Sequence, residues 1–145
     1  MANSDSTPKS ASNIIDIWRT WGPYMQGVLR IVAAFLFILA GTSKLFGFPA
    51  TNPPSSGTLP FMSQLWIGGV LETFGGSLLL LGLFTRPVAF LLSGEMAVAY
   101  FQFHFPRGFW PITNGGMPAV LFCFIWLYFS AAGGGPLSLD AKRGK

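Results

Sequence analysis

Four long apolar stretches dominate the pattern of this chain, separated by short polar or proline- and glycine-rich segments. They cover about residues 25–46, 61–84, 87–105 and 116–132. A helix needs about 20 mostly apolar residues to cross the hydrocarbon core of a bilayer, with a range of roughly 17–25. None of the stretches alternates apolar and polar residues as a membrane β-strand does. We therefore expect an all-α integral membrane four-helix bundle, formed by a single domain over residues 14–145.

The residues before the first stretch predict two further elements. Residues 1–13 are polar and rich in Ser, Asn and Thr, lack the pattern of a signal peptide, and are expected to form a mobile tail. Four apolar residues then follow at the spacing of one helix face: Ile14, Ile17, Trp18 and Trp21. Tryptophan favours the headgroup layer, so this segment is either a short N-terminal interfacial helix or the first turns of the following span. Gly22 and Pro23 are expected to separate it from that span.

The composition excludes several classes of protein. Hydrophobic residues make up 51% of the chain and charged residues only 10%, against roughly 25% charged residues in an ordinary soluble domain. The mean hydropathy is +0.52. A soluble enzyme and a disordered chain are therefore disfavoured. The net charge of +4 comes from bases spread along the chain, whereas nucleic-acid binding needs a basic cluster, so no nucleic-acid partner is expected.

The basic residues also predict the orientation in the membrane. Arg107 is the one base in the loops of one side, whereas the other side carries six: Lys9, Arg19, Arg86, Lys142, Arg143 and Lys145. By the positive-inside rule, both termini are expected in the cytoplasm.

Five ionisable residues lie within or at the edges of the expected spans: Arg30, Lys44, Glu72, Glu95 and His104. Such residues usually face the interior of a bundle and pair with one another. Their depths, at about 1.5 Å per residue, predict two layers. An outer layer of Lys44, Glu72 and His104 suits a quinone headgroup, because it offers hydrogen-bond donors and a route for protons. An inner layer predicts a buried ion pair between Arg30 and Glu95.

Each of these residues also has a purely structural interpretation. Arg30 and Lys44 can extend to the headgroups, and His104 can cap a helix end. Either glutamate can be protonated and bonded to the backbone, because burial disfavours the ionised form. The outer layer equally suits a structural ion pair.

Glycines in the second stretch indicate where Glu72 points. Small residues let a neighbouring helix approach closely. Glu72 shares a face with glycines that recur every seventh residue, so it is expected inside the protein and away from lipid. The repeat consists of Gly68, Gly75 and Gly82, with Gly69 and Gly76 as a parallel pair.

Cysteine and histidine are scarce, with one residue of each in the chain. Cys123 alone excludes an internal disulfide, a CxxC motif and thiol–quinone chemistry within one chain. His104 alone excludes a bis-histidine haem or a multi-histidine metal site within one protomer. No metal or covalent cofactor is expected, so any redox role requires a bound organic cofactor or a partner subunit.

Several short motifs in order resemble the DoxX family of small four-helix bacterial membrane proteins. The likeness covers nearly all of residues 26–140. It is carried by Arg30 and by GTSK (41–44), LETFGG (71–76), LGLFTR (81–86), EMAVAY (95–100), HFPRGFWP (104–111), NGG (114–116) and GGGPLSLD (133–140). The resemblance implies a four-helix bundle in the bacterial inner membrane. It also implies redox chemistry, since family members are described as membrane subunits of oxidoreductases, including thiosulfate:quinone oxidoreductase, and as anchors for redox-stress partners.

Two functions follow as expectations. The first is a membrane subunit of a redox or respiratory-type complex that contacts quinone through Lys44, Glu72 and His104. The second is a non-catalytic structural or assembly subunit of a larger membrane complex, with aromatic residues as its interface. A stand-alone enzyme is less favoured, because the sequence shows no nucleophile–base pair, metal set or phosphate-binding loop. Membrane lipid and other membrane or redox subunits are the expected partners.

Overall fold

The structure, a computed structural model, describes residues 9–50 and 59–144, and the regular structure in these ranges is entirely helical. The all-α prediction is therefore confirmed. The elements are α1 (Lys9–Phe46), α2 (Gln64–Val70), a π-helical turn η1 (Leu71–Gly75), α3 (Gly76–Leu81), α4 (Thr85–Ala99), a π-helical turn η2 (Tyr100–His104), a 3-10 turn η3 (Phe105–Arg107), α5 (Pro111–Asn114), α6 (Met117–Ala132) and α7 (Leu139–Lys142).

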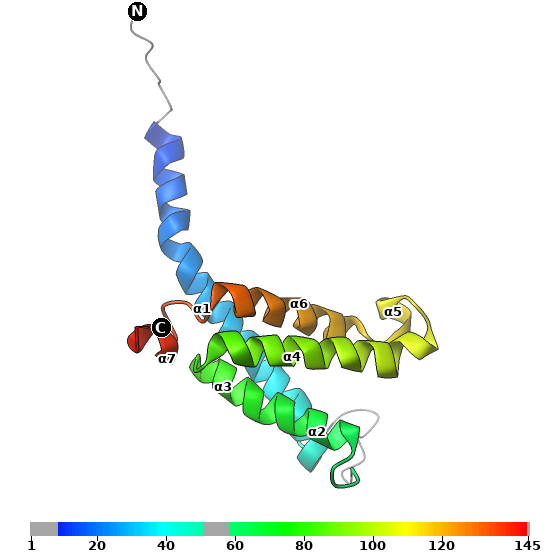
Figure 1. Ribbon diagram of the computed structural model, residues 1–145. Coiled ribbons are helices and arrows are strands. Elements are labelled where there is room, and N and C mark those ends of the chain that lie inside the picture. The colour runs from blue at the N-terminus through cyan, green and yellow to red at the C-terminus, as the bar shows by residue number, and fades with distance from the viewer. Residues whose placement is uncertain (1–8, 51–58, 145) are drawn as a thin grey trace, which may run out of the picture.

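The long helices form two antiparallel pairs (Figure 1). In one pair, α1 packs against the continuous helix α2–η1–α3, and in the other, α4 packs against α6. The N-terminal part of α1 stands clear of the bundle. Helix α7 lies at one end, beside the α3–α4 turn, whereas α5 lies at the opposite end. We call these the α7 end and the α5 end.

Aromatic and aliphatic side chains from both pairs fill the core. Trp126 and Phe129 of α6 are fully buried together with Leu79 of α3 and Leu92 of α4. Phe37 of α1 meets the Trp126 ring edge-on, with ring centroids 5.3 Å apart. Because the rings join α1 to α6, the two helix pairs form one hydrophobic core.

Three helical segments of the described residues are long and apolar enough to cross a membrane: Ile14–Phe46, Gln64–Leu81 and Thr85–Arg107. Helix α6 is apolar but has only 16 residues, about 24 Å at 1.5 Å per residue. A hydrocarbon core of about 30 Å exceeds that length. A full crossing by residues 116–132 therefore stays a prediction.

The predicted separation at Gly22 and Pro23 is wrong, because α1 continues through both residues. Proline removes one backbone donor, and the bonds on either side maintain the helix. Residues 14–21 are thus the beginning of the first long helix. Helix α1 already begins at Lys9, so residues 9–13 of the predicted tail are helical, whereas residues 1–8 lie outside the described residues.

The turn between the second and third apolar stretches also differs from the expectation. The stretches 61–84 and 87–105 leave Thr85 and Arg86 between them, but these two residues begin the first turn of α4. The turn instead uses left-handed conformations at Gly82 and Phe84, with φ of 67° and 50°. Proline is tolerated in a first helical turn, because the N–H that it lacks has no acceptor within the helix.

Glycine allows the closest approach between α1 and its partner helix. A Cβ atom at Gly41 would lie 2.7 Å from the backbone nitrogen of Thr73 and 2.8 Å from the carbonyl oxygen of Gly69. These are backbone atoms that cannot move aside. Two glycines of the predicted pattern face α1 as well, because a Cβ at Gly69 would lie 3.0 Å from Leu45 and one at Gly76 would lie 2.9 Å from Ile38.

We expect Gly41→Ala to destabilise the protein by about 1–3 kcal/mol, because the added methyl group must push α1 away from η1. Gly94→Ala is the matched control, since no atom lies within 4 Å of a Cβ there and alanine favours the helix. Thermal unfolding in detergent, followed by circular dichroism, measures both. Equal midpoints for the two variants would contradict this account of the packing.

Candidate functional site

A groove of about 840 Å³ lies between α2–η1 and the continuous helix α4–η2–η3. Its walls are largely apolar, with Leu65, Leu71 and Phe90 among the lining residues. Five ionisable side chains also line it: Lys44, Glu72, Glu95, His104 and Arg107. An apolar groove with a few polar groups converging on it is the usual form of a small-molecule site.

The lining of the groove includes an ion pair between α1 and η1. Lys44 Nζ lies 2.5 Å from Glu72 Oε1. The Glu72 side chain is only 3% exposed, whereas that of Lys44 is 34% exposed. A Cβ at Gly69 would lie 3.3 Å from the Cβ of Lys44, so this glycine lets α1 come close enough for the pair to form. Glu72 is inside the protein, as its position on the glycine face predicts.

Two π-helical turns carry groove residues. Glu72 lies in η1 and His104 closes η2. Such turns are rare, and they occur frequently at functional sites because the extra residue redirects side chains. The spacing of apolar residues does not reveal these π-helical turns, so the sequence alone does not predict them.

Glu95 belongs to the groove and not to a pair with Arg30. Its Oε1 atom is 3.3 Å from where a Cβ of Gly68 would be, and Glu95 interacts electrostatically with Glu72 and Lys44. Within the described residues, neither of its carboxylate oxygens has a hydrogen-bond partner. The predicted Arg30–Glu95 pair is therefore wrong. Depths counted along straight helices cannot tell which helix face a residue shares with its neighbours.

Arg30 is instead surrounded by backbone carbonyls at the α7 end. It is fully buried, and its Nε donates to Gly134 at 3.0 Å. Its two terminal nitrogens donate to Leu80 at 2.7 Å and to Leu137 at 2.6 Å, and also to Leu79. Carbonyls at the end of a helix lack partners within it, so the guanidinium satisfies them and ties the C-terminal segment to α3.

His104 reaches the same groove as Lys44 and Glu72 but bonds elsewhere. Its Nδ1 lies 3.2 Å from the carbonyl oxygen of Asn114. A carbonyl only accepts, so Nδ1 carries the proton of this bond. The neutral ring then has Nε2 as an acceptor. The three predicted residues thus line one groove, and the ion pair joins two of them.

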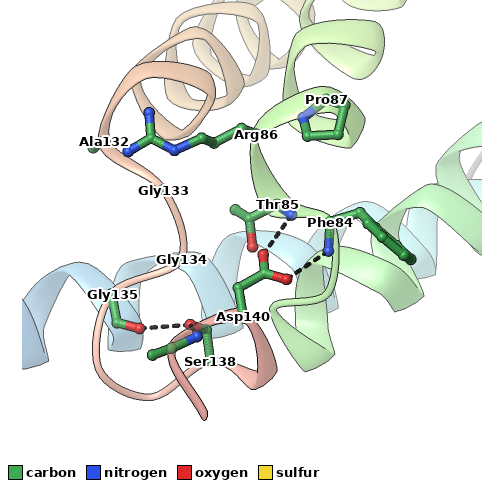
Figure 2. A pocket seen from close by; sticks show the side chains of 11 residues that line it. Phe84, Thr85, Arg86, Pro87, Ala132, Gly133, Gly134, Gly135, Ser138 and Asp140 are labelled. Atoms are coloured by element: carbon green, nitrogen blue, oxygen red, sulfur yellow. Dashed lines mark hydrogen bonds between the residues drawn. The ribbon is translucent and has the colours of Figure 1, made fainter. Parts of the chain in front are cut away.

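A second pocket of about 370 Å³ lies at the α7 end and is shown in Figure 2. There the Asp140 carboxylate accepts from the backbone nitrogens of Phe84 at 2.9 Å and Thr85 at 2.8 Å. The Asp140 nitrogen donates to Gly82 at 2.9 Å. This carboxylate caps the first turn of α4, for which Phe84 offers no side-chain acceptor.

Desolvation works to raise the pKa of Asp140, but the bonds from Thr85 and Phe84 together with the Arg143 charge hold that pKa below its ordinary value. The sequence patterns do not predict the capping role of Asp140 or the carbonyl partners of Arg30. The absence of a capping residue before α4 is the signal that an acceptor must come from elsewhere in the chain.

No group of three His, Cys, Asp or Glu side chains that could hold a metal ion occurs in the ranges that the structure describes.

Comparison with known proteins identifies relatives along most of the chain. The DoxX family model matches residues 26–105, which include all five of the ionisable residues singled out in the sequence. A Haemophilus influenzae protein, described as uncharacterized, is 46% identical over 123 residues, which are 83% of this chain and 91% of the relative. No solved structure matches the chain.

We expect Arg30→Lys to destabilise the protein by roughly 2–3 kcal/mol, although it keeps the charge. An ammonium has a single donor atom and cannot reproduce the planar fork that meets four carbonyls, so buried acceptors lose their bonds. Thermal unfolding measures the loss, with Arg19→Lys on the exposed part of α1 as the control. A wild-type midpoint for Arg30→Lys would show that the carbonyl contacts do not stabilise the fold.

We expect Asp140→Asn to cost about 1 kcal/mol at pH 7, because an amide has one acceptor oxygen and loses one of the two bonds from Phe84 and Thr85. Because the folded pKa is lowered, the stabilisation by Asp140 is complete above the unfolded pKa of about 3.9 and is lost as the pH falls through the lower folded value. The gap between wild-type and variant midpoints should thus narrow from pH 6 to pH 3. A gap that stays constant would contradict the role of the carboxylate.

Proposed function

This chain belongs to the DoxX family of membrane proteins, and from that premise we propose that it is an integral membrane subunit of a redox or respiratory-type complex that receives a quinone headgroup. The observation that carries the proposal is the apolar groove of about 840 Å³ with the Lys44–Glu72 ion pair in its lining. An isoprenoid quinone combines an apolar body with two carbonyl acceptors, and this groove offers apolar walls with polar groups at one place.

Two basic side chains in the groove lining, Lys44 and His104, fit such a ligand. A bound quinone would supply two carbonyl oxygens that accept hydrogen bonds and take up electrons and protons. Lys44 is the donor best placed for a carbonyl, because its ammonium is partly exposed while Glu72 holds it in position. Neutral His104 offers Nε2 as an acceptor suited to a quinol hydroxyl, and its protonated form offers a donor to a quinone.

We further propose that the protein lies in the inner membrane with both termini in the cytoplasm. Arg86, Lys142 and Arg143 come from segments of the α7 end, whereas Arg107 follows η2 toward the α5 end. The bias in basic residues supports a cytoplasmic α7 end. The groove residues Lys44 and His104 then lie nearer the outer surface.

A second candidate function, an assembly subunit without quinone, is supported by the N-terminal arm of α1. The segment Ile14–Phe46 is about 50 Å long at 1.5 Å per residue, so it exceeds the hydrocarbon core. The arm stands clear of the other helices (Figure 1), with Trp18 68% and Trp21 55% exposed. Such a surface suits either the headgroup layer or a partner subunit.

The test of the first candidate is photolabelling by an azido-ubiquinone, competed by unlabelled ubiquinone, on the full chain in lipid nanodiscs. We expect Lys44→Met to weaken competition about 10- to 100-fold, the loss of one charge-assisted hydrogen bond of roughly 1.5–3 kcal/mol. Glu72→Gln should cause a smaller loss, because Glu72 positions Lys44. Asp16→Asn, on the exposed arm, is the control.

Labelling of the groove that is equal in all three variants would refute the quinone contact. Wild-type protein that takes no label, but is purified with a stoichiometric larger subunit after gentle extraction, would favour the assembly function instead.

A further inference from the structure

The two carboxyl groups that line the groove differ in their contacts with cations. Lys44 supplies one ammonium group, which contacts Glu72 Oε1, whereas Glu72 and Glu95 supply two carboxyl groups. The other charged or titratable side chains that line the groove are His104 of η2 and Arg107 of η3. The His104 ring bonds to the carbonyl of Asn114, and Arg107 is exposed. Among the described groove residues, Lys44 contacts Glu72, and no cation contacts Glu95.

Three carboxyl oxygens of this cluster are buried without a hydrogen-bond partner among the described residues: Glu72 Oε2, Glu95 Oε1 and Glu95 Oε2. Glu72 as a whole is 2% exposed. A buried ionised carboxylate without donors is strongly disfavoured, because nothing replaces the water that it has lost. A proton removes the charge and converts one of the oxygens into a donor.

Glu95 of α4 faces the side of the continuous helix α2–η1–α3 from which Glu72 extends. Glu95 Oε1 lies 3.3 Å from the Cβ position of Gly68, and Gly68 precedes Glu72 by one helical turn. Residues at that spacing are neighbours on one face. Gly68 thus provides the space that brings Glu95 next to the Lys44–Glu72 pair.

A proton fits this place better than a metal cation does. The ammonium of Lys44 already lies against Glu72 and repels a second cation. The remaining walls are largely apolar and give few neutral oxygen ligands of the kind that alkali or alkaline-earth ions need.

From these contacts we propose that Glu95 and Glu72 together form a proton-binding site, in which the pair holds one exchangeable proton and Glu95 is the carboxyl group that carries it. The proposal deepens the proposed function, since quinone reduction consumes protons, but proton binding needs no quinone. When the site takes up a proton, one carboxylate oxygen becomes protonated. When the site releases it, the proton passes to water or to a bound quinone.

The experiment uses dicyclohexylcarbodiimide, an apolar reagent that reacts with protonated carboxyl groups in apolar surroundings, on the full chain in nanodiscs without quinone. Peptide mass spectrometry locates the adducts. We expect one adduct per chain at neutral pH, on Glu95, with labelling that falls as the pH rises. Glu95→Gln should lower groove labelling at least tenfold, with helical content unchanged.

Two further variants test the sharing of the ammonium. In Glu72→Gln, Lys44 has Glu95 as its remaining carboxylate partner, so Glu95 should ionise and its labelling should fall. In Lys44→Met, both carboxyl groups lose their counter-charge, so labelling should rise toward two adducts per chain. Asp16 on the exposed arm, modified by a water-soluble carbodiimide, is the control for reagent quality.

Absence of an adduct at Glu95, with Asp16 modified normally, would overturn the proposal. Labelling that sodium or potassium suppresses at constant pH would also overturn it, because the site would then bind an alkali cation. Quinone photolabelling is measured separately, so a groove that fails to bind quinone and still reacts with the carbodiimide would refute the proposed function alone.

Discussion

The ion pair between Lys44 and Glu72 is the interaction on which the rest of the groove depends. It joins the end of α1 to η1 at 2.5 Å, with the carboxylate almost fully buried and the ammonium partly open. A buried charge in apolar surroundings is tolerated only with a partner. The pair therefore holds a charged group where an apolar ligand can reach it. The close approach at Gly69 is what makes this contact geometrically accessible.

Arg30 is also a buried charge, but backbone carbonyls stabilise it instead of an opposite charge. It donates to four backbone carbonyls, it contacts no carboxylate within the part of the chain that the structure describes, and it is completely buried. Its donors satisfy the end of α3 and hold the C-terminal segment, while Asp140 of that segment caps α4. Buried polar groups at the α7 end thus hold the chain segments together, whereas Lys44 in the groove is partly exposed. The polar residues that stabilise the bundle are therefore different from those of the candidate site.

The residues differ in how far the sequence alone anticipated them. Glu72 was placed inside the bundle correctly, because glycines at helical spacing mark the face that packs. Glu95 was assigned to Arg30, since counting residues along a helix gives depth but not direction. The π-helical turns at Glu72 and His104 left no trace in the apolar pattern. Pro23 suggested a break, yet α1 tolerates it because the surrounding hydrogen bonds persist.

The sequence by itself determined the all-helical class, the positions of the apolar stretches and which charged residues lie within them. A chain with so few charged residues is suited to a lipid surrounding. In lipid, the backbone N–H and C=O groups of a helix must hydrogen-bond to one another within the helix. Only the tertiary structure decided which charges meet. Lys44 and Glu95 lie 28 residues before and 23 residues after Glu72 in the chain. Their placement around one groove depends on glycine-mediated helix packing and on helix faces, which are set by the whole bundle rather than by any one segment.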